Sequence, residues 1–466
     1  MRTSLLVAVL VITTSGSAWA QVATSSSAVA TSTATAQVRP IDARGLVQRP
    51  GFEPEDVVLF VPRLLLVPPR WALEVVFWPL RHGLRLIEKY YVIEHLEDLL
   101  YNDERTAGFM PSIFGLPGAG LSGGLRLFHN DLFGNGESVS VAASFGGLYQ
   151  QSYRLNLAAD RVGGSRLWFA GEASYEAKPN LYFSGIGDGD DSALGRNLDP
   201  YSAATQTRFS EDRYLMNFRL GSMHGRPGQL IRTGLAVTYN HRSFASGQRL
   251  SSGQLDTAQV YNTGLIPGFD DGANTMEVTA ELVLDYRDHP GRATDGFYLE
   301  AFAGGVPQQG NWQYFHWGVE ASTYFELWAK ERVLVLRGFV EGVEGNLDNI
   351  PFTELPRLGG PRRLRGYRLN TFRDEKAVLG TVEYRWHVHQ YITASLFVDV
   401  GQVNDNYIDL VLPGEDSNWK AGLGGGLRIG SERTTLVNID LAYGDRFTIL
   451  VSTEPLKAFE DRTKRL

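Results

Sequence analysis

Strict alternation of apolar and polar residues dominates the chain from residue 106 to residue 452. In Met276–Arg287 every second residue is apolar, and the residues between them are mostly charged. Ile392–Gly401 and Tyr153–Asp160 repeat this arrangement. Successive side chains of a β-strand point to opposite faces, so a period of two predicts strands with one apolar and one polar face.

Segments with this period recur along the rest of the chain. We predict strands near 107–116, 119–129, 137–146, 150–160, 166–176, 205–211, 213–223, 231–244, 275–286, 296–305, 316–329, 332–342, 377–388, 391–400, 419–429 and 437–452. The segment 205–211 is the weakest, and 437–452 is long enough to be a hairpin that turns at Gly444-Asp445. At roughly 22 residues per strand and connection, the 347 residues from 106 to 452 hold about 16 strands.

The length of these segments separates two classes of β protein. Strands of soluble β-sandwiches are typically about five or six residues long, whereas a tilted strand needs about 9–11 residues to cross a bilayer. Several segments here run to ten residues or more, and their polar faces mix acidic, basic and hydroxyl groups. A sheet in lipid must also close, because an open edge leaves backbone groups without partners. We therefore predict an all-β fold, a transmembrane antiparallel β-barrel of about 16 strands over residues 106–452.

Aromatic residues near the strand ends are candidates for the girdles that such barrels place at both membrane interfaces. These candidates are Trp168, Tyr175, Tyr182, Tyr239, Trp312, Trp317, Tyr324, Trp328 and Trp386.

The first 50 residues resemble a targeting segment and leader rather than a folded domain. Residues 1–20 combine Arg2, an apolar stretch at Leu5–Ile12 and the small-residue site Ala18-Trp19-Ala20, which is the pattern of a secretory signal peptide. Residues 21–50 begin with a run of Ser, Thr, Ala and Val without periodicity, so we expect a disordered leader.

A short helical segment is expected over residues 51–105. Leu86, Tyr90, Ile93, Leu96 and Leu100 fall on one helical stripe. Basic and aromatic residues earlier in the segment favour a helix lying in a membrane interface, while packing on the barrel or plugging it fits the same periodicity. No mature stretch of about 20 uncharged apolar residues exists, so no spanning helix is expected. Residues 453–466 form a charged tail beyond the last strand.

Composition narrows the functional classes. The chain has 44 basic and 52 acidic residues, a net charge of −8, and this acidic balance disfavours a nucleic-acid partner. It contains no cysteine, which excludes disulfides, zinc–thiolate sites and thiol catalysis.

Candidate catalytic and metal motifs are weak. Gly120–Gly124 matches G-x-S-x-G, but a nucleophile elbow requires a helix after the turn, and strand-like residues follow here. His387 and His389 share a strand face without a third ligand nearby, and Asp188–Asp191 lacks the glycine and glutamate of a calcium-binding EF-hand loop. We expect no catalytic residue, metal or cofactor, and the enzyme interpretation ranks last.

One long connection carries unusual charge. More than 30 residues separate the strands ending near Gly342 and starting near Ala377, and connections of that length are generally functional or disordered. Its arginines are Arg357, Arg362, Arg363, Arg365, Arg368 and Arg373. The polar faces of the next two strands offer Glu383 and Asp399, so a loop folded into the lumen would find carboxylate partners.

This loop resembles a known motif. Leu358–Tyr367, with Arg365-Gly366-Tyr367, is similar to the sixth-loop motif of the BamA/TamA outer-membrane family, also called the bacterial surface antigen family. Four further stretches resemble that family in the same order: Asp285–Asp288 with Gly296 (D-x-R-D), Glu383–Arg385 (E-Y-R), Phe397–Gly401 (F-x-D-x-G) and Asn438–Ala442 of its penultimate strand.

The resemblance implies a 16-stranded barrel whose sixth loop folds inward and docks on the F-x-D-x-G strand. Carried over, Arg365 would pair with Asp399, Gly366 would allow close backbone approach, and Tyr367 would pack inside. Phe397, Gly401 and Glu383 would be further lumen partners of the loop. The alternative is that Arg365 lies in a solvated extracellular loop. Family members usually carry periplasmic POTRA domains, and this sequence resembles a member without them.

The resemblance also implies a function. We expect non-enzymatic insertion or translocation of protein or lipid in the outer membrane of a Gram-negative bacterium, through the seam between first and last strands. Four residues weaken pairing around the first strand: Pro111, Gly115, Pro117 and Gly118. Expected partners are outer-membrane lipid and lipopolysaccharide, and unfolded outer-membrane protein or lipid clients. The rival interpretation is a passive channel or structural surface antigen, and a third is an exporter of a neighbouring partner.

Overall fold

The computed structural model describes the barrel portion of the chain in detail. Described residues are 100–104, 106–116, 120–147, 149–187, 206–226, 228–248, 253–289, 292–328, 332–389, 392–407, 410, 419–430 and 435–452. They all belong to one compact unit, residues 63–466. The predicted signal peptide (1–20), leader (21–50), C-terminal tail (453–466) and Asp188–Asp191, and nearly all of the helical segment (51–105), lie outside the described residues.

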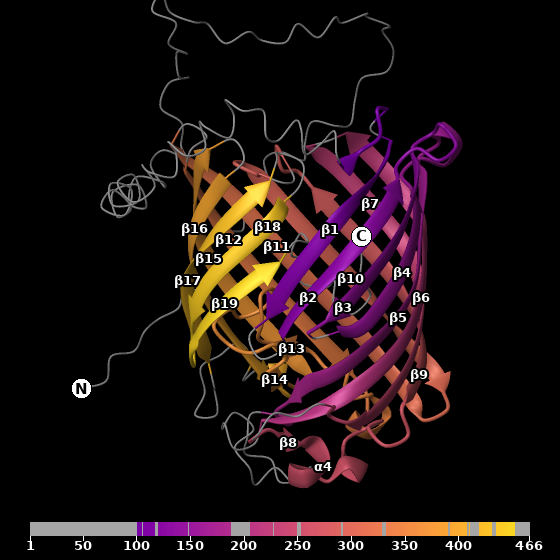
Figure 1. Ribbon diagram of the computed structural model, residues 1–466, viewed down its shortest axis with the longest axis vertical. Coiled ribbons are helices and arrows are strands. Elements are labelled where there is room, and N and C mark those ends of the chain that lie inside the picture. The colour runs from indigo at the N-terminus through magenta and orange to yellow at the C-terminus, as the bar shows by residue number, and fades with distance from the viewer. Residues whose placement is uncertain are drawn as a thin grey trace, which may run out of the picture. The chain divides into compact units, whose positions relative to one another are not determined.

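Sixteen long strands make up the wall of this unit within the described residues (Figure 1). They are β1 (Ala107–Leu116), β2 (Gly120–His129), β3 (Glu137–Gly146), β4 (Tyr149–Ala159), β5 (Leu167–Phe183), β6 (Thr207–Arg226), β7 (Gln229–Ser246), β9 (Ala273–Asp285), β10 (Gly296–Gln309), β11 (Trp312–Trp328), β12 (Arg332–Glu344), β15 (Lys376–His389), β16 (Ile392–Asn404), β17 (Lys420–Gly430), β18 (Thr435–Tyr443) and β19 (Phe447–Ser452). Each pairs antiparallel with the next along the chain, which confirms the predicted fold class and strand number.

The burial pattern of the strands is inverted relative to a soluble protein. On β6 the apolar side chains are exposed: Tyr214 is 51%, Met216 61% and Phe218 55% exposed. The polar side chains between them are buried: Arg213 is 1%, Asn217 5% and Arg219 6% exposed. β7 and β9 repeat this alternation. An apolar exterior and a polar interior are what lipid outside and a packed polar lumen inside require.

Two of the predicted girdle residues face inward instead. Trp168 is buried, and its indole N–H donates to the carbonyl of Thr233 while Arg232 stacks on its ring. Tyr324 is also buried on the lumen face, with the Arg385 guanidinium over its ring. Cation–π stacking in the lumen therefore holds these two rings, and they cannot contribute to a lipid-facing girdle.

One strand differs from its prediction. The segments 205–211 and 213–223 form the single strand β6, because Thr207–Glu211 continues the ladder and pairs with β5 and β7. The predicted hairpin at Gly444-Asp445 is present, since β18 ends at Tyr443 and β19 begins at Phe447.

The long connections share one end of the barrel. Residues 184–206, 247–272, 345–375 and 405–419 join strands at the end where β8 (Leu255–Asp256) and α4 (Thr257–Val260) lie, whereas the other end has shorter turns (Figure 1). Outer-membrane barrels have short periplasmic turns and long extracellular loops, so we expect the end with β8 and α4 to be extracellular. No helix among the described residues is long and apolar enough to cross a membrane.

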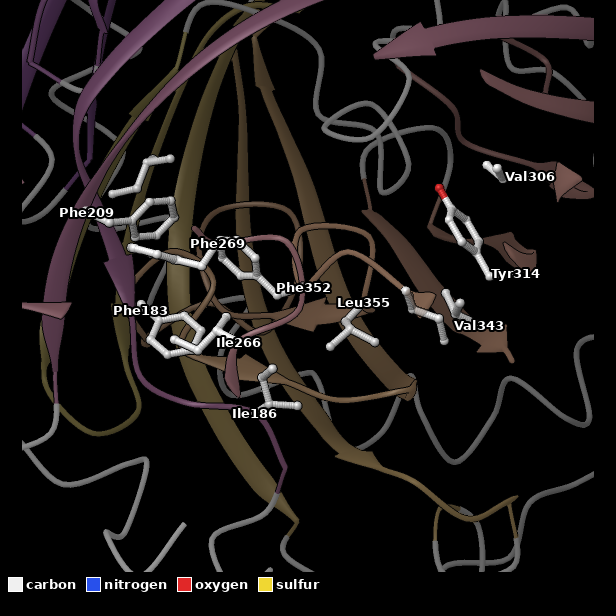
Figure 2. Close-up of a cluster of buried hydrophobic side chains, with 12 residues drawn as sticks. Phe183, Ile186, Phe209, Ile266, Phe269, Val306, Tyr314, Val343, Phe352 and Leu355 are labelled. Atoms are coloured by element: carbon white, nitrogen blue, oxygen red, sulfur yellow. The ribbon is translucent and has the colours of Figure 1, made fainter. Parts of the chain in front are cut away.

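An apolar cluster fills the barrel at this extracellular end. Phe183 and Phe209 from the wall meet Ile266 and Phe269 from the 247–272 connection and Phe352 from the 345–375 connection. Figure 2 shows Phe209, Phe269 and Phe352 gathered inside the strands. The ring centroids of Phe352 and Phe209 are 5.6 Å apart, in an edge-to-face arrangement that favours aromatic pairs. The cluster joins two loops to the wall.

The first and last strands of the wall meet over a very short length. Among the described residues, β1 and β19 share the single register pair Gly115↔Val451. By comparison, ten register pairs join β1 to β2 and six join β18 to β19. We call this edge between β1 and β19 the seam.

Candidate functional site: the inward loop

The connection of residues 345–375, here called the inward loop, folds into the lumen. It carries the short strands β13 (Arg357–Leu358) and β14 (Phe372–Arg373), which pair with each other. Leu358 and Leu364 are fully buried against side chains of the wall, in a cluster that includes Phe339 and Leu379. These apolar contacts between loop and wall position the polar groups of the loop.

Arg365 and Asp399 form the most complete contact between loop and wall. The Arg365 Nε donates to Oδ2 of Asp399 at 2.8 Å and Nη2 donates to Oδ1 at 2.9 Å. The backbone N–H of Arg365 also donates to Oδ2, at 3.0 Å. Both side chains are buried. This bidentate, charge-assisted geometry is the strongest hydrogen-bonding arrangement open to a guanidinium and a carboxylate.

The strands around Asp399 complete this contact. The Thr381 hydroxyl donates to Oδ1 of Asp399 at 2.9 Å, so the carboxylate accepts hydrogen bonds on both oxygens. The guanidinium carbon of Arg365 lies 3.3 Å from the centre of the Phe397 ring. Stacking on an aromatic face and pairing with a carboxylate use different sides of the planar guanidinium, so the two contacts reinforce each other.

Glu383 is a secondary partner of the loop. Its Oε2 lies 3.8 Å from Nη1 of Arg365, whereas Oε1 lies 2.9 Å from both Nε of Arg385 and Nη2 of Arg428. Asp440 of β18 lies 4.0 Å from Nη1 of Arg365. This buried cluster contains three guanidinium groups and three carboxylates, so its formal charges cancel. Its members are Arg365, Arg385, Arg428, Glu383, Asp399 and Asp440. Removing one member of such a cluster leaves an uncompensated buried charge.

Gly366 and Tyr367 bring the loop backbone onto β17 and β18. Gly366 has a φ of 97°, and a Cβ there would lie 2.6 Å from the backbone N of Gly444. The Tyr367 hydroxyl donates to the carbonyl of Ala421 at 3.0 Å. The loop therefore needs a glycine at 366 for two reasons, its left-handed backbone and its contact with the β18–β19 turn.

Gly401 makes a different contact from Asp399. A Cβ at Gly401 would lie 3.1 Å from Cδ1 of Leu358, so this glycine makes room for the β13 strand of the loop and not for Arg365. The structure thus brings Arg365 into direct contact with Asp399 and Phe397. Glu383 lies farther from Arg365, and Gly401 contacts Leu358 instead.

Comparison with known proteins assigns the family. A family model described as the Omp85 superfamily domain matches residues 131–446, more than half of the chain. This chain belongs to the Omp85 superfamily. Members of this superfamily are outer-membrane β-barrels, and the resemblance to BamA-type barrels that the motifs indicated is confirmed. No curated protein matches the sequence.

One of the similar solved structures, a BamA, shows the same fold. BamA from Haemophilus ducreyi lacking POTRA domains 1–3 aligns with a TM-score of 0.52 at 14% identity, over 75% of this chain and 70% of that chain. CdiB from Acinetobacter baumannii aligns at 13% identity, over 74% of this chain and 58% of that chain, with a TM-score of 0.43. CdiB from Escherichia coli aligns at 12% identity, over 74% of this chain and 62% of that chain, with a TM-score of 0.44. At such identities the BamA likeness shows the fold alone.

One feature of this Omp85 site escaped the sequence interpretation. The lumen face of β17 presents Gly422, Gly424 and Gly426 in succession. A Cβ at Gly422 would lie 1.8 Å from the Arg365 carbonyl oxygen, and one at Gly424 would lie 2.7 Å from the Phe397 ring. Glycine at every second position of a strand indicates close approach of another chain segment, and this signal was present in the sequence.

Two residues of the weak catalytic and metal motifs make hydrogen bonds within the barrel wall. Ser122 lies within β2, where its hydroxyl donates to the Gly146 carbonyl at 2.5 Å. His387 contacts the Thr393 hydroxyl through Nδ1 at 2.8 Å. Within the described part of the chain, no group of three or more His, Asp or Glu side chains is arranged to hold a metal ion.

Proposed function

We propose that this Omp85 barrel inserts protein clients into the outer membrane of a Gram-negative bacterium, without enzymatic chemistry, through the seam between β1 and β19. The observation that carries the proposal is the single register pair Gly115↔Val451 at that edge. A strand edge in lipid with unpaired amides is costly, so a seam this short favours pairing with an incoming strand.

Strand addition supplies the physical step. An extended client strand that aligns with β1 gains main-chain hydrogen bonds where β19 offers few, which is the principle of β-augmentation. Pro111 of β1 has no N–H to donate, so the edge remains less tightly paired than a regular strand. Outer-membrane lipid and lipopolysaccharide would surround the apolar exterior, and an unfolded β-barrel protein would be the client.

The extracellular end disfavours the passive-channel interpretation. The aromatic cluster around Phe352 and the docked inward loop fill the lumen where a pore would open. A porin-like channel requires a continuous aqueous path, whereas this interior contains packed aromatic rings and paired charges.

Reconstitution tests the proposal. The mature protein is placed in liposomes, and the folding rate of a denatured small outer-membrane barrel is compared with that in empty liposomes and in liposomes holding an unrelated barrel of similar size. We expect faster client folding only with this protein. Equal rates in all three, with this protein itself folded, would contradict insertion, and conductance across planar bilayers would then decide for or against a channel.

A further inference from the structure

A second buried ion pair holds the inward loop, away from Arg365. Arg363 donates from Nη1 to Oε2 of Glu341 on β12 at 2.8 Å, and its guanidinium carbon lies 4.6 Å from the centre of the Phe339 ring. The Glu341 side chain is fully buried and that of Arg363 is 7% exposed. Arg365 binds β16 instead, so the two arginines contact different parts of the wall.

The contact continues beyond Glu341 through a histidine. Nε2 of His316 on β11 lies 3.0 Å from Oε1 of Glu341, and Nδ1 lies 2.9 Å from Oε1 of Glu277 on β9. The imidazole of His316 thus bridges the side chains of Glu341 and Glu277 through its two ring nitrogens.

The path from β11 to β9 must cross β10, and a glycine makes this possible. Gly304 of β10 is the register partner of His316. A Cβ at Gly304 would lie 2.0 Å from the carbonyl oxygen of Val278 on β9, so β9 and β10 approach closely where the imidazole of His316 reaches Glu277. Phe302, two residues earlier on the same strand, supports the imidazole edge-to-face at 4.5 Å between ring centroids. Each side chain along the path is therefore fixed by a neighbour.

We propose that Arg363, acting through Glu341, His316 and Glu277, is a second anchor that positions the inward loop. It ties the loop to β12, β11 and β9, whereas Arg365 ties it to β16. The loop is thereby held between two parts of the wall, and loss of either anchor frees one side. The relevance of this anchor to client insertion rests on the function proposed above, but the anchor itself does not.

The arginines of the loop provide a direct readout. Trypsin cleaves after Arg357, Arg362, Arg363, Arg365, Arg368 and Arg373 only when the loop leaves the lumen, because these residues are buried or partly buried when docked. The full-length protein in detergent is treated with trypsin, and fragments from cuts within residues 345–375 are quantified by mass spectrometry. Heat-dependent gel mobility shows in parallel that each variant forms a folded barrel.

The expected order of cleavage rates is specific. Arg363→Gln raises the rate about tenfold or more, because opening of the docked loop becomes easier once Glu341 loses its partner. Arg363→Lys recovers most of the protection, since a cation again faces Glu341. The double variant Arg363→Gln with Glu341→Gln is cleaved no faster than Arg363→Gln alone. Arg226→Gln, an exposed arginine at the end of β6, leaves the rate unchanged.

Two results would overturn the anchor. One is a folded Arg363→Gln variant whose loop is cleaved at the wild-type rate. The other is a His316→Gln variant with full protection, which would end the path at Glu341. Wild-type protein with a protected loop but no client folding would instead contradict the proposed function and leave the anchor standing.

Discussion

The carbonyl oxygen of Arg365 lies where a side chain at Gly422 would begin. A Cβ at Gly422 would be 1.8 Å from that oxygen, which is far inside van der Waals contact. Gly422 is also the register partner of Asp399, the residue that binds the Arg365 side chain. A single cross-strand pair thus provides both the charge that holds the arginine and the space that admits its backbone.

Gly422→Ala should undock the loop while every charged group stays in place. The added methyl group must displace the Arg365 backbone, and overpacking of this kind costs about 1–3 kcal/mol. We expect faster trypsin cleavage in the loop and slower client folding. Gly338→Ala is the matched control, since a Cβ at Gly338 meets no heavy atom within 4 Å. Equal protection of the loop in both variants would refute the contact.

Arg365→Ala should abolish client folding but leave a folded barrel. The change leaves Asp399 buried without its cation, and breaking a buried pair costs about 3–5 kcal/mol. That cost falls on loop docking, because the strand ladder does not involve Arg365. Arg365→Lys should be partly active, since an ammonium cannot make the bidentate contact. Client folding rates and heat-dependent gel mobility measure both effects, and wild-type activity of the alanine variant would reject the docking role.

Phe352→Ala should open the extracellular end. Phe352 is fully buried, and its ring lies 4.8 Å from that of Phe244 and 5.8 Å from that of Phe269. Truncating a buried phenylalanine costs about 3–5 kcal/mol, and here the cavity forms where two loops meet the wall. Single-protein conductance in planar bilayers should rise above that of the wild type. Leu336→Ala on the lipid face serves as control, and unchanged conductance of Phe352→Ala would show that the cluster does not block the lumen.

The strand number could be predicted because lipid imposes a strict period of two. That period fails at the start of β6, where Thr207–Glu211 is buried on both faces beside the extracellular loops. Alternation disappears when both faces are buried, so the sequence suggested a separate segment there. The inward-facing Trp168 and Tyr324 were missed for a related reason, since an aromatic residue near a strand end fits either face.

The candidate site was only partly predictable. Arg365 and Asp399 came from the resemblance of two motifs, and the structure brings these residues together. The path from Arg363 to Glu277 was not predicted, because it depends on which residues face one another across β9, β10, β11 and β12. Glu277 and His316 are 39 positions apart in the chain, and no spacing rule connects them.

Locking the seam tests the central claim most directly. The chain has no cysteine, so Gly115→Cys with Val451→Cys introduces one defined pair at the register contact of β1 and β19. Facing residues of antiparallel strands have Cα atoms about 4.5–5.5 Å apart, within the range a disulfide spans. Gly338→Cys with Gly380→Cys places a matched pair between β12 and β15. Insertion through the seam predicts that the oxidised seam pair no longer accelerates client folding, that reduction restores it, and that the oxidised control pair remains active. Full acceleration by the oxidised seam pair would contradict the account.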